Sequence, residues 1–325
     1  MRKLSRRLVW SLIVVLGIAA SPVYATTSFT INPTFTAGFV TNFGANAIAA
    51  ENAFNAAAAI FTGAFDNPIA VNITVNAVAG TGTLGASSTP VFSIAWSSLD
   101  AAVVANDTGP LGGSSAQLTS IGPGGSITAA DPSGGAGTFW ITRADRKALG
   151  LLASDGANDG TITVGTGFSY TFNNSGGVAP GTIDLEGVFA HEISEVMGRI
   201  GISGGSIGGI QPSYTLLDAL SYSGAGTRGL GNGAGNFFSI DAGTHLLKAF
   251  NNQAGLGGDS RDWASGANDA FNAFSSSGVV NGVTLIDLEE MNVLGYDLAT
   301  PEPATFGLVG GVLVAVSFLR RRLRK

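Results

Sequence analysis

Three residues in one short segment have the types and spacing that metal-dependent hydrolysis requires. His191, Glu192 and Glu195 lie within VFAHEISEVMGRIG, the stretch that spans positions 188–201. On a helix, residues four positions apart share a face, so His191 and Glu195 can converge on one ion. Zinc accepts imidazole nitrogen and carboxylate oxygen, and a catalytic site combines three protein ligands with an open position for water. The pattern predicts His191 and Glu195 as zinc ligands and Glu192, about 100° further round the helix, as the general base.

The same residues also have an interpretation without chemistry. Glu195 and Arg199 form an i, i+4 acid–base pair, which contributes about 0.2–0.5 kcal/mol on a helix surface. His191 can then be a hydrogen-bonded core histidine. The five-residue pattern H-E-x-x-E by itself leaves both interpretations open.

A third metal ligand has to come from elsewhere in the chain. The only other histidine is His245, which follows the turn-like DAGT and is expected on a surface hairpin. Asp218 in YTLLDALSYS is the predicted third ligand, because it is a lone acid among apolar neighbours, where an unpaired charge is costly. A turn or cap aspartate is the alternative for Asp218. A glycine-rich stretch also offers oxygen ligands for Ca²⁺, without the spacing of a calcium loop, at Asp259, Asp262 and Asp269.

The elements that position these residues can be read from the hydrophobic pattern. The motif helix is predicted to begin near Thr182, a plausible N-cap, and to end within 198–201, where glycines supply a left-handed cap. Its apolar stripe faces a core and consists of Phe189, Ile193, Val196 and Ile200. Other expected elements are a helix near 46–65, an alternating strand at 69–76, a short helix within 139–152, and an alternating strand at 161–172.

The composition excludes several other classes of function. The 325 residues include no cysteine, which excludes disulfides, thiolate zinc sites and a cysteine nucleophile. Positions 26–300 contain 7 basic and 21 acidic residues, a formal charge of −14. Such a surface repels phosphate backbones, so no nucleic-acid partner is expected. About 275 residues are enough for one large domain with its own core.

Both ends of the chain have the pattern of export signals. A basic start, an apolar run and small residues before Ala25 predict a secretory signal peptide at 1–25. In the tail, 301–325, the tripeptide PEP precedes an uncharged run at 304–319 and a cluster of arginines. At about 1.5 Å per residue that run spans roughly 24 Å, somewhat short of a ~30 Å hydrocarbon core unless neighbours contribute.

The order proline–glutamate–proline, apolar helix and arginine cluster closely resembles the PEP-CTERM sorting tail of Gram-negative bacteria. The resemblance implies that an exosortase-type sorting enzyme holds this tail in the inner membrane and removes it during export. The protein would then be anchored transiently before it reaches the cell surface or the extracellular space. An ordinary tail anchor is the alternative, although hydropathy alone requires neither proline.

The motif helix resembles the active-site helix of the metzincin metalloproteases, whose pattern is H-E-x-x-H-x-x-G-x-x-H. His191, Glu192 and Gly198 match this pattern. Glu195 stands where the second histidine belongs, and Gly201 stands at the third. Metzincins also have a methionine turn beneath the metal.

The only late methionine, Met291, is expected in the core instead. It lies in TLIDLEEMNVLGYDL, which reads as a capped helix over 284–295. The chain is also similar to a group of exported PEP-CTERM proteins described as metalloproteases, which carry helices of the HEISEVMGR type. That similarity continues through LLDALSYS, GGDSRDWA and LIDLEEMNVLGYDL and covers about 181–298.

Pattern and resemblance together predict an α+β, zincin-like metalloprotease domain at 26–300, with a small mixed β-sheet and an active-site helix. A signal peptide at 1–25 and a transmembrane sorting tail at 301–325 flank it. The expected function is zinc-dependent hydrolysis of peptide bonds in a protein or peptide substrate outside the cell. The alternative is a non-catalytic surface or matrix protein, in which the helix is structural or binds metal only for stability.

Overall fold

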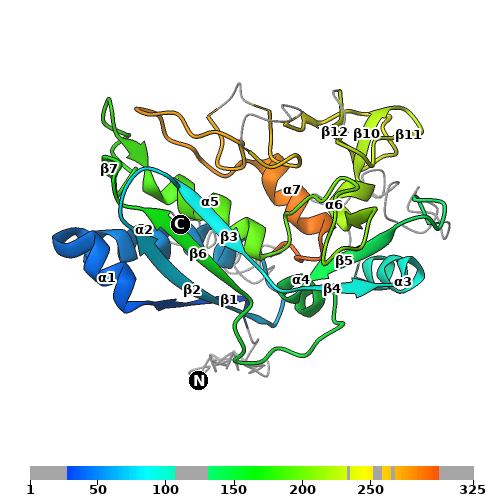
Figure 1. The fold of residues 1–325 in the computed structure, drawn as a ribbon, viewed down its shortest axis with the longest axis horizontal. Coiled ribbons are helices and arrows are strands. Elements are labelled where there is room, and N and C mark those ends of the chain that lie inside the picture. Colours follow the sequence, from blue (N-terminus) through cyan, green and yellow to red (C-terminus); the bar gives the residue numbers. More distant parts are fainter. Residues whose placement is uncertain (1–27, 107–130, 233–234, 252–257, 265–267, 300–325) are drawn as a thin grey trace, which may run out of the picture.

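The computed structural model describes residues 28–106, 131–232, 235–251, 258–264 and 268–299 (Figure 1). The predicted signal peptide at 1–25 and sorting tail at 301–325 lie outside these residues. Among the described helices, none has both the length and the apolar character needed to cross a membrane. The chain forms a mixed α+β structure with several small sheets.

A four-stranded mixed sheet packs against the motif helix and positions it. Its strand order is β1 (Thr30–Phe35), β2 (Ala70–Val78), β6 (Gly160–Gly165) and β3 (Gly85–Ser88). The first three strands run parallel, and β3 pairs antiparallel with β6 at one edge. The sheet therefore ends in a short strand, β3, next to the motif helix.

The sequence pattern of β2 explains why one face of this sheet is covered. Its alternate residues are buried, namely Val71, Ile73, Val75 and Ala77. The residues between them are half-buried polar side chains. The predicted alternating strand is confirmed, and its apolar side faces the helices.

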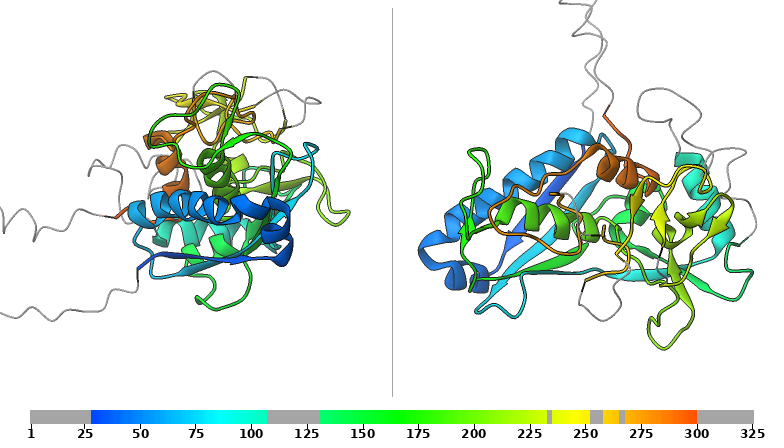
Figure 2. Two further views of the ribbon diagram at one scale, coloured as in Figure 1. Left: turned by 90° about the vertical axis from the view of Figure 1, so that its left-hand side faces the viewer. Right: turned by 90° about the horizontal axis from the view of Figure 1, so that it is seen from above.

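Two helices pack side by side over that apolar face (Figure 2). They are α2 (Ala47–Ala64), preceded by α1 (Ala37–Phe43) and a 3₁₀ turn (Gly44–Asn46), and the motif helix α5 (Leu185–Val196). The rings of Phe54 in α2 and Phe189 in α5 meet edge to face, with centroids 5.3 Å apart. Such a pair adds about 0.5–1.5 kcal/mol to the area that it buries, so α2 holds α5 in place.

The observed start of α5 differs from the predicted one. Ile183–Asp184 forms a short strand, β8, that pairs with β7 (Tyr170–Thr171), and Asp184 is the residue before the helix. The Asp184 carboxylate is buried, and its charge is satisfied by hydrogen bonds that it accepts from the Asn174 side chain and the Asn281 backbone. The prediction of a start near Thr182 was wrong because these partners are distant in sequence.

The end of α5 lies two residues before the predicted range of 198–201, although a glycine does follow it as predicted. The helix ends at Val196, and Gly198 has a φ of 121°, which favours glycine. A Cβ at Gly198 would also lie 2.4 Å from the carboxyl of Asp145, so the turn has no room for a side chain. The alternating segment at 161–172 is not one strand, because it breaks between β6 and β7.

The remaining elements surround the other side of α5. A second sheet has the order β4 (Val91–Ile94), β5 (Thr138–Thr142) and β9 (Ser213–Thr215). The third has the order β11 (Thr227–Arg228), β10 (Ser221–Gly224), β12 (Phe237–Phe238) and β13 (Lys248–Ala249). The helices are α3 (Trp96–Asn106), α4 (Arg143–Ala148), α6 (Leu216–Ala219) and α7 (Leu285–Val293).

Helix α7 confirms the prediction for the late methionine. Met291 is fully buried in the core cluster, on the helix expected over 284–295. The expected helix near 46–65 and the short helix within 139–152 are also present, as α2 and α4. Of the described residues after α5, most lie in loops between short elements (Figure 1).

Candidate metal centre

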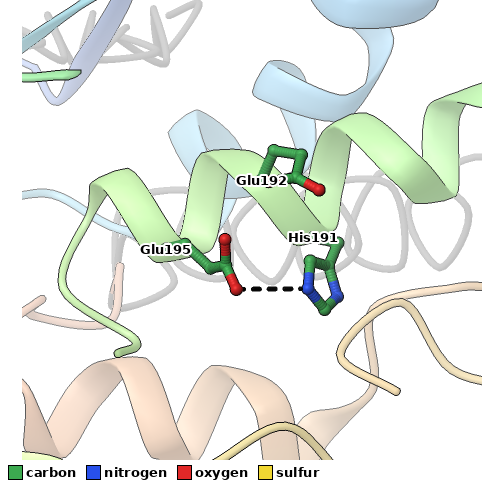
Figure 3. A group of neighbouring side chains, drawn as sticks. All are labelled: His191, Glu192 and Glu195. Carbon is green, nitrogen blue, oxygen red and sulfur yellow. Dashed lines mark ion pairs between the residues drawn. The ribbon is translucent and has the colours of Figure 1, made fainter. Parts of the chain in front are cut away.

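Helix α5 brings His191 and Glu195 to one place. Both side chains project from the same side of the helix, and Glu192 projects from an adjoining side (Figure 3). Nε2 of His191 lies 3.3 Å from Oε1 of Glu195. The spacing of four residues therefore has the effect that the sequence predicts, because one turn of helix aligns the two side chains.

The orientation of His191 is fixed from a loop. Nδ1 lies 2.8 Å from the backbone oxygen of Ala270, and because a carbonyl oxygen only accepts, Nδ1 is the donor. The other nitrogen, Nε2, faces two carboxylates, that of Glu195 and that of Asp262 at 3.6 Å. Metal-binding histidines are held in this way, with one ring nitrogen donating to an oxygen and the other facing the ion.

The charges around His191 change its protonation. Burial by itself lowers the pKa of His191, but the negative charges of Asp262 and Glu195 outweigh burial and raise that pKa to about 10. In the absence of metal the imidazole is therefore protonated at neutral pH. A metal ion would displace the Nε2 proton, since only the neutral ring is a ligand.

The carboxylate of Glu195 is oriented by two neighbours. Ser87 on β3 donates its hydroxyl hydrogen to Oε2 at 2.7 Å, so Oε1 is left to face His191. Burial raises the pKa of Glu195, but the charge and hydrogen bond of His191 and the charge of Arg199 together lower that pKa to about 2. Glu195 is thus ionised at neutral pH, as a metal ligand has to be.

Arg199 forms the i, i+4 pair with Glu195 that the alternative interpretation describes, but the pair lies in the interior and not on a helix surface. Only 1% of Arg199 is exposed, and its guanidinium lies 4.5 Å above the ring of Phe271. Nη2 lies 3.6 Å from Oε1 of Glu195, and Nη1 donates to Oδ1 of Asp262 at 2.5 Å. Nε donates to the hydroxyl of Ser194 at 2.7 Å. Arg199 therefore balances the charge of two buried carboxylates.

Glu192 has the environment of an acid–base group. The residue is 5% exposed, and its Oε2 has no hydrogen-bond partner among the described residues. Burial and then the negative charge of Glu195 raise the pKa of Glu192 to about 9. A carboxyl group that titrates so high, beside a cleft, is a candidate for proton transfer.

The side chains of α5 lie along a cleft of about 820 Å³. One wall is β3 with the residues before it, and the other is formed by loops at 258–262 and 269–275. His191, Glu192 and Glu195 all line this cleft. A molecule bound in this cleft would therefore contact all three of these side chains.

Two overlapping groups of side chains are close enough to hold a metal ion. In each group, one ligand atom per residue lies within 4.8 Å of the others. The first group is His191, Glu192 and Glu195, and the second is Glu195, Asp259 and Asp262. The two groups share Glu195, and Asp262 of the second group lies 3.6 Å from Nε2 of His191 in the first.

Asp218 does not join this centre, which corrects the predicted ligand set. Its carboxylate caps α6 by accepting from the Thr215 backbone and also accepts from the backbone of Ser203. Arg261 donates its Nε hydrogen to Asp218 at 2.8 Å, which balances the buried charge. The cap interpretation of Asp218 is the one that the geometry supports.

Gly201 occupies the position at which metzincins have a third histidine, and the structure explains the glycine. A Cβ there would lie 1.9 Å from Cγ of Arg261, so no side chain fits. His245 is exposed and pairs with Asp241 in a turn, as expected for a hairpin residue. Of the candidate calcium ligands, Asp259 and Asp262 reach the centre, whereas Asp269 pairs with Lys248.

The sequence pattern missed the role of Asp262 as a neighbour of His191. The residue was noted only for its glycine-rich surroundings. In the structure, the neighbours Arg261 and Asp262 are the partners of one buried acid and one buried base, Asp218 and Arg199. The sequence around Arg261 and Asp262 does not show which ion-pair partner each residue has.

The glycine at position 85 of β3 allows the strand to approach the helix. A Cβ there would lie 2.3 Å from Oε1 of Glu192 and 3.0 Å from Cγ1 of Val188. We therefore expect Gly85→Ala to displace the Glu192 carboxyl and to lower any hydrolytic rate at least tenfold. The cost in stability should be smaller than about 1–3 kcal/mol, because a flexible side-chain end can move.

A matched control is present in the same segment. Gly82 lines the cleft too, but a Cβ at that position meets no atom within 4 Å. Gly82→Ala should leave the rate within twofold of the parent. Equal rates for Gly85→Ala and the parent would show that the contact between β3 and Glu192 is unimportant.

Comparison of the chain with protein-family models, with curated proteins and with solved structures finds no match.

Proposed function

We propose that this protein is an exported, metal-dependent hydrolase of peptide bonds, with zinc as the metal. The observation that carries the proposal is the placement of His191, whose Nδ1 is fixed by a backbone oxygen and whose Nε2 faces carboxylates at the wall of a cleft. His191 and Glu195 would hold the ion, and Glu192 would be the general base.

The donor set fits zinc. Imidazole nitrogen with carboxylate oxygen is a combination that zinc accepts, and a catalytic site leaves one position open. When bound, the ion would supply a Lewis acid that acidifies a water molecule, polarises a carbonyl group and favours the ionised form of Glu192.

The residues of the chain supply the remaining chemistry. Glu192, ionised, would accept a proton from the attacking water at its carboxylate and return it to the amide nitrogen that leaves. The unpartnered Oε2 of Glu192 is free to receive that proton. The cleft beside β3 would hold an extended peptide, which is the reason for preferring a protein or peptide substrate.

Export belongs to the same proposal and rests on the two termini. The resemblance of 301–325 to a PEP-CTERM tail supports a route through the inner membrane, with an exosortase-type enzyme as partner. The protein would act at the cell surface or outside the cell.

One observation favours the rival, a non-catalytic surface or matrix protein. Arg199 already balances Glu195 and Asp262, so the helix can be satisfied without an ion. In that case α5 is structural, or its metal serves stability alone.

Titration of zinc into the full chain and into His191→Ala separates these possibilities. We expect tight binding by the parent and about 100-fold weaker binding by the variant, because one imidazole ligand is lost. Equal, weak binding in both would contradict a metal centre on α5. Tight binding without cleavage of an unfolded protein substrate would support the rival.

A further inference from the structure

A metal centre on α5 needs a third protein ligand besides His191 and Glu195, because the proposed function gives Glu192, the other member of the group on α5, to proton transfer. Among the described residues, the carboxylates that approach Glu195 from outside α5 within ligand spacing are those of Asp259 and Asp262. Asp259 is exposed, whereas Asp262 is only 3% exposed. Ligands that orient a buried ion are themselves held in place, so the two aspartates are not equivalent.

The Asp262 carboxylate is aimed at the position that His191 faces. Its Oδ1 lies 3.6 Å from Nε2 of His191, while its Oδ2 accepts a hydrogen bond from the backbone of Asp259 at 3.2 Å. One oxygen thus holds the orientation and the other faces the imidazole. Oδ1 also accepts from Arg199, and a carboxylate oxygen has lone pairs for both an arginine and an ion.

The chain on both sides of Asp262 is clamped into the core. Arg261 is buried against Asp218, with its Nε 2.8 Å from the carboxylate. Trp263 is fully buried, stacks on Phe250 with centroids 5.2 Å apart, and donates its indole hydrogen to Asp287 at 2.7 Å. Two large buried side chains therefore fix the residue between them.

A second observation, independent of the approach of Asp259 and Asp262, indicates a ligand at this place. The unpartnered Oε2 of Glu192 is buried at the cleft, and Nδ1 of His191 is held by Ala270 so that Nε2 faces inward. Three carboxylates, those of Glu195, Asp259 and Asp262, come together beside Arg199 and His191. A divalent cation would reduce the remaining negative charge.

We propose that Asp262 is the third protein ligand of the metal centre, which gives a set of one imidazole and two carboxylates: His191, Glu195 and Asp262. The assignment rests on the metal binding in the proposed function but not on catalysis. It replaces the role predicted for Asp218, whose oxygens already serve Arg261 and the backbone.

The test compares two similar aspartates in the full chain. Asp262 pairs with Arg199 and Asp218 pairs with Arg261, and both acids are buried. After removal of metal with a chelator, zinc is titrated calorimetrically into the parent, Asp262→Asn and Asp218→Asn. We expect zinc affinity to fall about 100-fold or more in Asp262→Asn, and to stay within about threefold in Asp218→Asn.

Zinc should also raise the melting temperature of the parent and of Asp218→Asn, but not that of Asp262→Asn. Equal zinc affinity in the two variants would overturn the assignment. If zinc binds through Asp262 and no peptide is cleaved, the ligand assignment stands and the proposed hydrolase activity fails.

A spectroscopic variant guards against loss of folding in Asp262→Asn. The chain has no cysteine, so Asp262→Cys introduces a single thiol, and thiolates bind transition metals. Loading with Co²⁺ should give a sulfur-to-cobalt charge-transfer band in Asp262→Cys and none in Asp218→Cys. A folded Asp262→Cys variant that binds Co²⁺ without this band would overturn the assignment.

Discussion

Glu192→Gln is expected to lower the rate of peptide-bond hydrolysis by about 10²–10⁴-fold while the protein keeps its zinc. The reason is that a glutamine side chain has the shape of glutamate but cannot accept the proton of the attacking water. Glu192 lies beside His191 and Glu195, the proposed ligands, but faces an adjoining side of the helix (Figure 3). Rate and metal content, measured on the same preparation, separate the two roles.

The control for Glu192→Gln lies on the same helix. Glu186 is in the first turn of α5 and accepts a hydrogen bond from the Asn174 backbone at 3.1 Å. Because an amide oxygen also accepts, Glu186→Gln should keep the rate within twofold of the parent. Full activity in Glu192→Gln, or loss of its zinc to the extent seen in His191→Ala, would contradict the role of Glu192 as a base.

The same substitution has a pH-dependent effect on stability in the metal-free protein. Burial and the charge of Glu195 raise the pKa of Glu192 from 4.5 to about 9. The folded state then binds the proton more tightly than the unfolded state, so this group makes the free energy of unfolding fall as pH rises from about 4.5 to 9. Glu192→Gln should remove that contribution, as urea unfolding at several pH values can show.

Arg199→Met is expected to destabilise the metal-free protein by about 3–5 kcal/mol, because it leaves two buried carboxylates with His191 as the remaining cation beside them. Glu195 and Asp262 are 5% and 3% exposed, and Arg199 lies within ion-pair distance of both. Methionine preserves much of the packing on Phe271, so the loss is mainly one of charge. Urea unfolding with and without zinc measures the effect.

Zinc should offset much of the cost of Arg199→Met, since an ion at His191 supplies positive charge to the same carboxylates. Arg261→Met is the matched control, because it breaks the similar pair with Asp218 away from the centre. That variant should lose comparable stability and gain from zinc no more than the parent does. A cost below about 1 kcal/mol for Arg199→Met would mean that the pair contributes no more than an exposed one does.

Features that depend on local pattern were predictable from the sequence. The spacing of His191 and Glu195 placed both on one side of a helix, and they lie 3.3 Å apart. The glycine at 198 marked the end of α5, and the apolar spacing around Met291 marked a core helix. The periods of helices and strands appear as a repeat of apolar residues that are close in sequence, so these elements can be predicted from the sequence itself.

The start of α5 and the break between β6 and β7 were not predictable in this way. Asp184 is held at the head of the helix by Asn281, 97 positions further along the chain. Tertiary contacts of this kind override local preference at the ends of elements.

The sequence by itself determined the chemistry that α5 offers: a histidine and a glutamate that can serve as ligands, a second glutamate beside them, and no cysteine to compete. Only the tertiary structure decided which acid lies beside them. The sequence around Asp218 and Asp262 does not show their partners, but in the folded chain Asp218 pairs with Arg261, and Asp262 lies beside Arg199 and His191. A contact between positions 191 and 262 depends on how the whole chain packs, and no local period records it.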